Sequence, residues 1–252
     1  MATALLAGTF VAAQSGLTPP QIGFLRDSAY NVRPLLGISG NFWLGEIVAA
    51  GVVSAASSGC ASMLKTATSL LVLNALGKPV GIAATASGTA LFAFTPAGAP
   101  ALAWLADSSE LLRWNGSRFQ LTPVTMAVLN GIVASVAAPD SSRAAFLVQR
   151  GQQLWVVDVS LLDGGVLFAA NLPGVAAPAL LLDDGTILYT GPSALVLRNS
   201  QGEERTIAFS GSAPQFTPMG QDWILIESAK PPDHLGLRLS TGALFELPEV
   251  VQ

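Results

Sequence analysis

The residues that could carry acid–base chemistry are few, and the single histidine comes first. His234 ends the run Pro231-Pro232-Asp233-His234. A catalytic histidine needs a nucleophile and an orienting acid close to it in space. Asp233 is next to it in the sequence, but adjacent residues seldom point in the same direction. The run has the composition of a proline-rich hairpin loop, so we assign His234 to a binding loop and not to a catalytic centre.

Two further groups could be metal ligands. One histidine and one cysteine, Cys60, fall short of the usual zinc ligand set. Asp183-Asp184-Gly185 could bind calcium, which prefers clustered carboxylates. However, no Asp-x-Asp-x-Asp series follows, and aspartate and glycine are also the residues that turns favour. We therefore predict a turn at this site, a buried structural thiol for Cys60, and neither a metal nor a cofactor.

Aromatic and basic side chains offer a recognition surface instead. Trp155 and Trp223 lie within strand-like runs, where a large ring usually packs in the core. Trp114 lies beside a turn, and we expect it to be the most exposed of the five tryptophans. The candidate turns are Asp107–Glu110, Arg113–Arg118, Gln149–Gln152 and Lys230–His234. The candidate binding-loop residues are Arg113, Trp114, Asn115, Arg118, Arg150 and His234.

The most regular part of the chain is Ala137–Gly165. Two strand-like runs, Arg143–Val148 and Gln153–Val159, flank the short turn Gln149–Gln152. Asp-Ser-Ser opens this unit and Asp-Gly-Gly closes it. Elsewhere, Asn115-Gly116 is a strong hairpin signal, because both central residues of a type I′ turn need positive φ. The pattern predicts antiparallel hairpins that recur along the chain.

Comparable turns follow apolar strands in five places: Ser57-Ser58-Gly59, Ala86-Ser87-Gly88, Asp140-Ser141-Ser142, Asp183-Asp184-Gly185 and Met219-Gly220-Gln221. A period of about 40 residues built from strands indicates a propeller or a solenoid, and four strands per unit favour the propeller. We predict one domain over residues 21–250. Its units are 21–44 (partial), 47–78, 80–124, 128–172, 175–210 and 212–250.

The stretch APDSSRAAFLVQRGQQLWVVDV resembles the repeats of TolB-type and WD-repeat-like β-propellers. Pro139, Asp140, Leu154, Trp155 and Asp158 match that pattern, whereas serine stands where glycine is usual. The resemblance implies a fold and carries no active site. Five full units and a partial one predict an all-β propeller with six four-stranded antiparallel blades, with five or seven left open. We expect Gln21–Ile38 to close the ring by pairing with strands near one end of the chain.

Composition narrows the class of protein. The chain has 252 residues, of which 51% are hydrophobic and 11% charged, with a net charge of −4 and no basic clusters. These values exclude the electrostatic signature of a nucleic-acid-binding protein. Pro79–Ala106 and Leu121–Ala138 are uncharged, but proline and glycine interrupt the first, and the second is shorter than the roughly 20 residues of a spanning helix. We interpret both as buried strands and expect no transmembrane span.

The N-terminus suggests export. The run MATALLAGTFVAA ends in small residues, as a signal peptide cleaved after Ala13 would, although a positively charged start is missing. Residues 1–13 could instead be an apolar strand or a disordered tail. We expect a secreted or periplasmic protein.

These observations favour a non-catalytic binding or scaffold module whose partner is an unidentified protein or small ligand. Two alternatives stay open. A hydrolase or lyase on the same scaffold would need Asp, Glu, Arg or His side chains that converge on the central channel. The chain could also be a structural fragment of a larger surface assembly.

Overall fold

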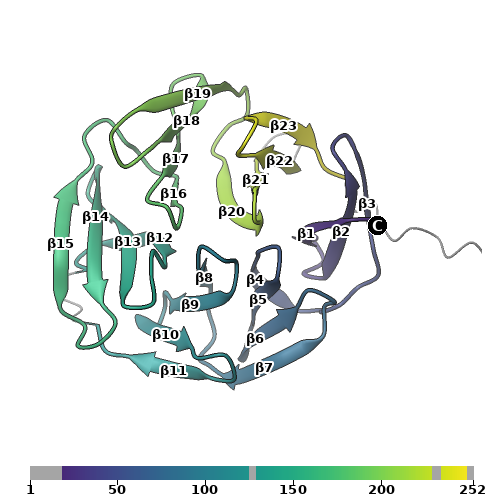
Figure 1. Ribbon diagram of the computed structural model, residues 1–252, viewed down its shortest axis with the longest axis horizontal. Helices are drawn as coiled ribbons and strands as arrows, with labels where there is room; N and C mark the ends of the chain where they lie inside the picture. Colours follow the sequence, from purple (N-terminus) through teal and green to yellow (C-terminus); the bar gives the residue numbers. More distant parts are fainter. Residues whose placement is uncertain (1–18, 125–128, 229–233, 249–252) are drawn as a thin grey trace, which may run out of the picture.

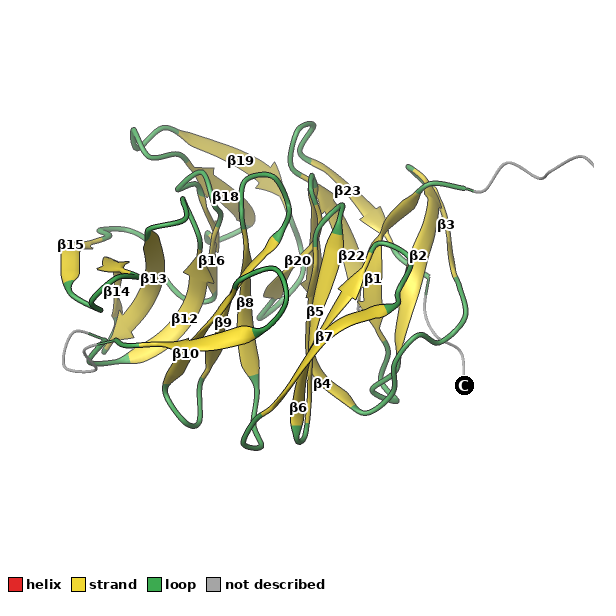
Figure 2. Cartoon of the chain, turned by 60° about the horizontal axis from the view of Figure 1, so that its bottom comes forward, coloured by secondary structure: helices red, strands yellow, loops and turns green. Residues whose placement is uncertain are grey.

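The computed structural model describes residues 19–124, 129–228 and 234–248, and these form a six-bladed β-propeller (Figure 1). The blades are antiparallel sheets that stand side by side around a central channel, as the turned view also shows (Figure 2). The predicted all-β propeller is therefore confirmed. No helix within these ranges is long and apolar enough to cross a membrane. The predicted signal peptide, residues 1–13, lies outside the described residues.

The described residues contain 23 strands. Blade 1 has β1 (Gln21–Arg26), β2 (Val32–Ile38) and β3 (Asn41–Leu44), and blade 2 has β4 (Val52–Ser57), β5 (Ala61–Thr66), β6 (Ser69–Asn74) and β7 (Pro79–Ala84). Blade 3 has β8 (Ala90–Phe94), β9 (Pro100–Leu105), β10 (Glu110–Trp114) and β11 (Phe119–Thr122). Blade 4 has β12 (Ile132–Ala137), β13 (Arg143–Arg150), β14 (Gln153–Ser160) and β15 (Val166–Asn171). Blade 5 has β16 (Ala179–Leu181), β17 (Ile187–Thr190), β18 (Ala194–Arg198) and β19 (Glu204–Ala208), and blade 6 has β20 (Gln215–Gly220), β21 (Trp223–Glu227), β22 (His234–Arg238) and β23 (Ala243–Glu246).

The unit 80–124 began one strand too early. Pro79–Ala84 pairs with β6 and is the outer strand of blade 2. The turn Ala86-Ser87-Gly88 therefore joins two blades, and the turn that corresponds to those of the other units is 95–99, between β8 and β9. An apolar run next to a turn looks the same in an outer strand and in an inner one, so the pattern alone could not separate them.

The five innermost strands run in the same direction along the channel: β4, β8, β12, β16 and β20. Residues from the first parts of all five line one cavity, and residues from their ends line a second cavity. We call the end of the channel where these strands begin the charged mouth, and the end where they finish the far mouth.

Strand β1 runs in the opposite direction. Its last residue, Arg26, lines the cavity at the charged mouth. Gly23 lies against Met219, near the end of β20, and the Phe24 N–H donates to Ser57 Oγ at the end of β4. The three strands of blade 1 thus have the direction of the second, third and fourth strands of the other blades.

The ring closes between β4 and β20, on the channel side of β1. Strands β4 and β20 contact each other directly, and Ser57 Oγ donates to the Met219 carbonyl at 2.5 Å. Figure 1 shows β4 and β20 meeting near the axis, with β1 farther out. Among the described residues, blade 1 therefore has three strands and lacks an innermost one. Gln21–Ile38 pairs with β3, near the N-terminal end of the chain, and these three strands form a sheet of their own.

Apolar side chains fill the seams between blades. Trp104 of blade 3 meets Phe146 of blade 4 edge-on, with ring centroids 5.6 Å apart. At the closing seam, Phe42 of blade 1 meets Trp223 of blade 6 edge-on at 5.8 Å. A single blade exposes two apolar faces, and stacking against both neighbours removes them from water.

Candidate functional site

The central channel is the main concave feature that the inner strands share. Its cavity at the charged mouth has a volume of about 340 Å³ and is bounded by residues of all five inner strands. Small side chains such as Ala55, Ala90, Ala134 and Ala179 form much of the wall. Because their side chains end at Cβ, the channel stays open between the strands.

Two serines in the channel region tie neighbouring blades together. Ser54 Oγ accepts a hydrogen bond from the Ala90 N–H at 3.1 Å, and Ser135 Oγ accepts one from the Leu181 N–H at 3.0 Å. Both serines lie next to register shifts, in β4 and β12. Such bulges redirect a side chain relative to the regular strand. These hydroxyls therefore hold the ring together and are engaged as acceptors.

A cluster of three titratable residues lies at the charged mouth. Glu227 Oε1 is 3.6 Å from Arg26 Nη2 and 3.7 Å from His234 Nε2. Glu227 ends β21, and His234 begins β22 directly opposite it in the register. Arg26 arrives from blade 1 only because β1 runs in reverse and ends at this mouth. We call these three residues the mouth cluster.

The mouth cluster favours the ionised form of Glu227. The interaction with the His234 ring is the main influence that lowers the pKa of Glu227, burial opposes it, and Arg26 lowers the pKa further. About a quarter of each of the three side chains is exposed. The Arg26 guanidinium also lies 5.6 Å from the Tyr30 ring centroid, a cation–π distance. The cluster offers N–H donors beside one carboxylate acceptor, at the edge of an apolar cavity.

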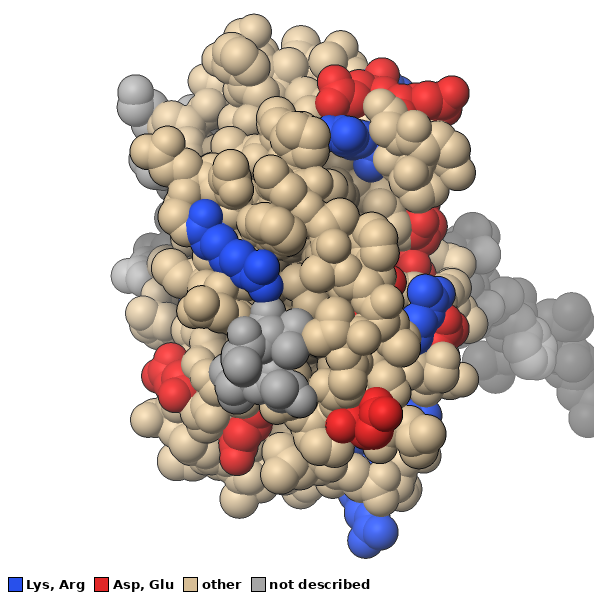
Figure 3. Space-filling model, turned by 90° about the vertical axis from the view of Figure 1, so that its left-hand side faces the viewer, with Lys and Arg blue, Asp and Glu red and all other residues tan. Residues whose placement is uncertain are grey.

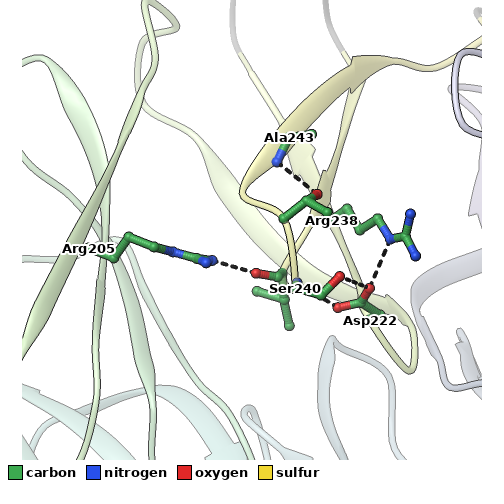
Figure 4. A network of polar contacts seen from close by, with 7 residues as sticks. Arg205, Asp222, Arg238, Ser240 and Ala243 are labelled. Atoms are coloured by element: carbon green, nitrogen blue, oxygen red, sulfur yellow. Dashed lines mark hydrogen bonds and ion pairs between the residues drawn. The ribbon is translucent and has the colours of Figure 1, made fainter.

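The far mouth has a second cavity of about 210 Å³. Several of its polar groups have structural roles: the Ser58 hydroxyl donates to the Gly98 carbonyl, and Asp184 accepts from the Thr186 N–H at 2.8 Å. The predicted turn at Asp183-Asp184-Gly185 is thus confirmed. Outside the cavity, Asp222 binds Arg238 and Ser240, and Arg205 of blade 5 donates to the Leu239 carbonyl of blade 6 (Figure 4). These contacts fix loops and seams at this end.

The hairpin Arg113–Arg118 lies at the outer edge of blade 3, on β10 and β11, away from both channel cavities. Its loop has four residues, and Asn115 Oδ1 closes it by accepting from the N–H groups of Ser117 and Arg118. The hairpin is confirmed, but Asn115 lacks the positive φ that a type I′ turn requires. A role in binding for Arg113, Trp114, Asn115 and Arg118 stays a prediction.

The tryptophans differ from expectation. Trp114 is half-buried against Phe119 and over Gly81 of blade 2, whereas Trp43 on the outer strand β3 is 42% exposed. Trp223 is buried as predicted, but Trp155 is only half-buried. Its ring lies 4.9 Å from the Arg150 guanidinium, at the hairpin between β13 and β14. An inner or outer place within a blade decided these exposures, and the local sequence does not encode it.

Cys60 corrects another prediction. It is exposed, because it lies in the loop between β4 and β5, with Sγ 3.8 Å from the Ala97 carbonyl. The apolar sequence around it belongs to the strands on either side of that loop. In the part of the chain that the structure describes, no three His, Cys, Asp or Glu side chains are grouped so as to hold a metal ion.

Of the six predicted binding residues, the structure places His234 beside Glu227, which lines the channel cavity, and leaves the other five on outer hairpins. The rest of the Lys230–His234 loop lies outside the described residues. Sequence reasoning missed Arg26 and Glu227 as partners of His234. Each is a charge at the end of an apolar strand, which is a usable signal, but 201 positions separate the two in the chain. Only the ring brings them together.

Comparison with known proteins gives the fold alone. No protein-family model and no curated protein matches the chain. A structure of a nidogen/laminin complex is similar with a TM-score of 0.58 and 11% identity, covering 90% of this chain and 93% of that chain. TolB from Acinetobacter baumannii is similar with a TM-score of 0.52 and 12% identity, covering 89% of this chain and 65% of that one.

Hydrazine synthase from Kuenenia stuttgartiensis is a third similar structure, with a TM-score of 0.51, 10% identity, and coverage of 94% of this chain and 81% of that chain. These likenesses confirm the predicted β-propeller architecture, with TolB among the similar structures. These three differently named proteins share one architecture, so the function of this chain has to be argued from its site.

Proposed function

We propose that this chain is a non-catalytic, extracytoplasmic binding module that recognises a polar group of a protein or small ligand at its charged mouth. One observation carries the proposal: Arg26, Glu227 and His234 stand together at the rim of an open channel with small, apolar walls. Such a cavity with a few convergent polar groups is the usual form of a binding site. The export-like N-terminal run supports the extracytoplasmic part.

The mouth cluster can bind a group that has both donors and acceptors. Arg26 and His234 can donate to a ligand oxygen, and Glu227 can accept from a ligand N–H or O–H. An amide, an amino acid or a sugar edge has this combination. Strands β1, β21 and β22 hold the three side chains in place without ligand, which reduces the ordering cost of binding.

The test is a thermal-shift screen with amides, amino acids, dicarboxylates and sugars. We expect at least one class to stabilise the protein, and Glu227→Gln and His234→Ala to abolish that shift. Arg118→Ala, on the outer hairpin, is the matched control and should keep it. If the shift is instead lost in Arg118→Ala and kept in both cluster variants, the hairpin is the binding site and the proposal is wrong.

A second candidate has support from the same cluster. A hydrolase or lyase was expected to require acidic and basic side chains converging on the channel, and His234 beside Glu227 meets that description. A carboxylate that orients an imidazole is a common base arrangement. The two candidates separate by product analysis: after incubation with a stabilising compound, mass spectrometry should recover it unchanged. Turnover that disappears in His234→Ala would favour the enzyme.

A further inference from the structure

A further concave site lies between blades 4 and 5, apart from the charged mouth, and shares residues 181–184 with the lining of the far-mouth cavity. It has a volume of about 510 Å³. Its origin is a difference in strand length: β13 and β14 have 8 residues each, whereas β16 has 3 and β17 has 4. The shorter blade leaves part of the face of blade 4 uncovered. We call this site the interblade groove.

The floor of the interblade groove is apolar. Ala145, Val156, Phe168 and Ala170 line it, from three adjacent strands of blade 4. In the register, Val156 lies opposite Ala170, and Asp158 lies opposite both Ala145 and Phe168, so these residues share one face of the sheet. Phe168 is 54% exposed. A large apolar side chain with this exposure is ready to be covered by a partner.

The outer side of the floor ends at an unpaired sheet edge. Strand β15 is the outermost strand of its sheet, and among the described strands it pairs only with β14. Its sequence, VLFAAN, has no charge and no proline. The edge strand of blade 5 carries Glu204 and Arg205, and that of blade 2 begins with Pro79. Charge and proline protect an edge from added strands. The outer edge strands β3 (NFWL) and β11 (FQLT) also lack both, but each has four residues, so β15, with six, is the longest unprotected outer edge among the described strands.

The side of the molecule that bears β15 is shown in Figure 3. Most of this surface is uncharged, with basic side-chain atoms near the middle of the face and other charged groups nearer its margins. An extended segment could therefore approach β15 without having to displace a dense layer of charged side chains.

The charged side chains that line the groove are Asp158, Asp183, Asp184, Arg143 and Arg198, so acidic groups are in excess by one. Asp158 has one ion-pair partner, Arg143 at 3.6 Å, and Arg143 is also held by Asp140 at 2.7 Å. Asp183 lies beside Asp184, and no described side chain donates a hydrogen bond to it. Burial raises the pKa of both Asp158 and Asp183. Both carboxylates are partly desolvated, and the groove has an excess of acidic groups, so a cationic partner would be favoured there.

We propose that the interblade groove binds an extended peptide segment of a partner protein, which adds as a strand to β15 and places an apolar side chain on the floor and a lysine or arginine beside Asp158 and Asp183. Unpaired backbone groups of β15 supply main-chain hydrogen bonds, and the floor and the two carboxylates supply the sequence preference. This site is separate from the charged mouth, and neither depends on the other.

The probe is a fluorescein-labelled heptapeptide, Thr-Val-Thr-Val-Thr-Lys-Thr, with blocked ends, followed by anisotropy. Valine and lysine then share one face of the strand. We expect saturable binding, and about tenfold weaker binding when glutamate replaces the lysine. Two N-methylated versions are compared, one methylated at the backbone nitrogens of the threonines and one at those of the valines. The version whose methylated nitrogens face β15 should lose binding, because it cannot donate hydrogen bonds to that strand.

Ala170→Arg places a bulky cation on the floor and should weaken binding of the lysine peptide at least about tenfold. Asp183→Asn is a milder second variant and should weaken it by a few fold. Ile82→Arg, on the exposed outer strand of blade 2, is the matched control and should leave binding unchanged.

Several results would overturn the proposal. They are no binding at about 1 mM peptide, equal binding of the lysine and glutamate peptides, equal effects of Ala170→Arg and Ile82→Arg, or undiminished binding of both N-methylated peptides. Light scattering that shows a dimer dissociated by Ala170→Arg but not by Ile82→Arg would assign the groove to a second copy of this chain instead.

Discussion

The closing seam, where blade 1 packs against blades 6 and 2, differs from the seam between blades 3 and 4. Both are apolar, and both contain an edge-on aromatic pair. The seam between blades 3 and 4 has innermost strands on both sides, β8 and β12, which contact each other. Among the described residues, the closing seam lacks an innermost strand on the blade 1 side.

At the closing seam, the backbones of blades 1 and 6 approach each other closely, in place of the missing innermost strand. A Cβ added at Gly23 would lie 1.6 Å from the Met219 carbonyl oxygen, and one added at Gly220 would lie 2.3 Å from the Ile22 carbonyl oxygen. Ser57 then joins three blades, accepting from the Phe24 N–H and donating to the Met219 carbonyl. The comparison teaches that a ring can close with an incomplete blade when glycine lets two backbones meet directly.

Phe146→Ala tests the seam between blades 3 and 4 and should have the largest effect. The ring is fully buried against Trp104, so its loss should lower the free energy of unfolding by about 3–5 kcal/mol. Denaturant unfolding followed by tryptophan fluorescence measures the change. A loss below about 1 kcal/mol would mean that this seam is not a close-packed interface.

Gly23→Ala tests the closing seam. The added methyl group meets backbone and not a flexible side chain, so the free energy of unfolding should fall by about 2–3 kcal/mol. Gly59→Ala is the control, because its nearest neighbour atom would lie 3.6 Å away, at an ordinary contact distance. Equal stability of the two variants would show that the backbones do not meet as described.

Trp155→Ala tests the margin of the seam between blades 3 and 4. The side chain packs against that seam's core cluster but is only half-buried, with Arg150 over its ring. We expect a loss of about 1–2 kcal/mol, smaller than for Phe146→Ala. A loss as large as that of Phe146→Ala would place the ring in the core after all.

Acid pH should weaken the mouth cluster, because the pKa of Glu227 is lowered first by the His234 ring of the same blade and then by Arg26, which pairs with Glu227 across the closing seam. The folded-state pKa of Glu227 is lowered, so its stabilisation is present above the unfolded value of about 4.3 and is lost as the pH falls through the folded value.

The expected size is below about 1 kcal/mol, since the pair is partly exposed. Unfolding curves at pH 7 and pH 3 should show a smaller acid-induced loss in Glu227→Gln than in the unaltered protein. Glu246→Gln, exposed at the end of β23, should behave as the unaltered protein does. An identical acid loss in all three would remove Glu227 from the seam.

Much of the fold was predictable, and little of the candidate site was. The strands Arg143–Val148 and Gln153–Val159 were predicted within two residues of β13 and β14, since the turn between them is a local signal. His234 was predicted as a binding residue, but its partners Arg26 and Glu227 were not. No local pattern reports which charged strand ends will meet across a ring.

By itself, the sequence determined that the chain forms short antiparallel strands stacked in blades, because turn residues and apolar runs act over a few positions. The tertiary structure decided that β1 runs in reverse, that β4 and β20 close in front of it, and that Arg26 reaches Glu227 and His234. These outcomes depend on contacts between the two ends of the chain. Such contacts follow from the geometry of the closed ring and not from any neighbouring residues.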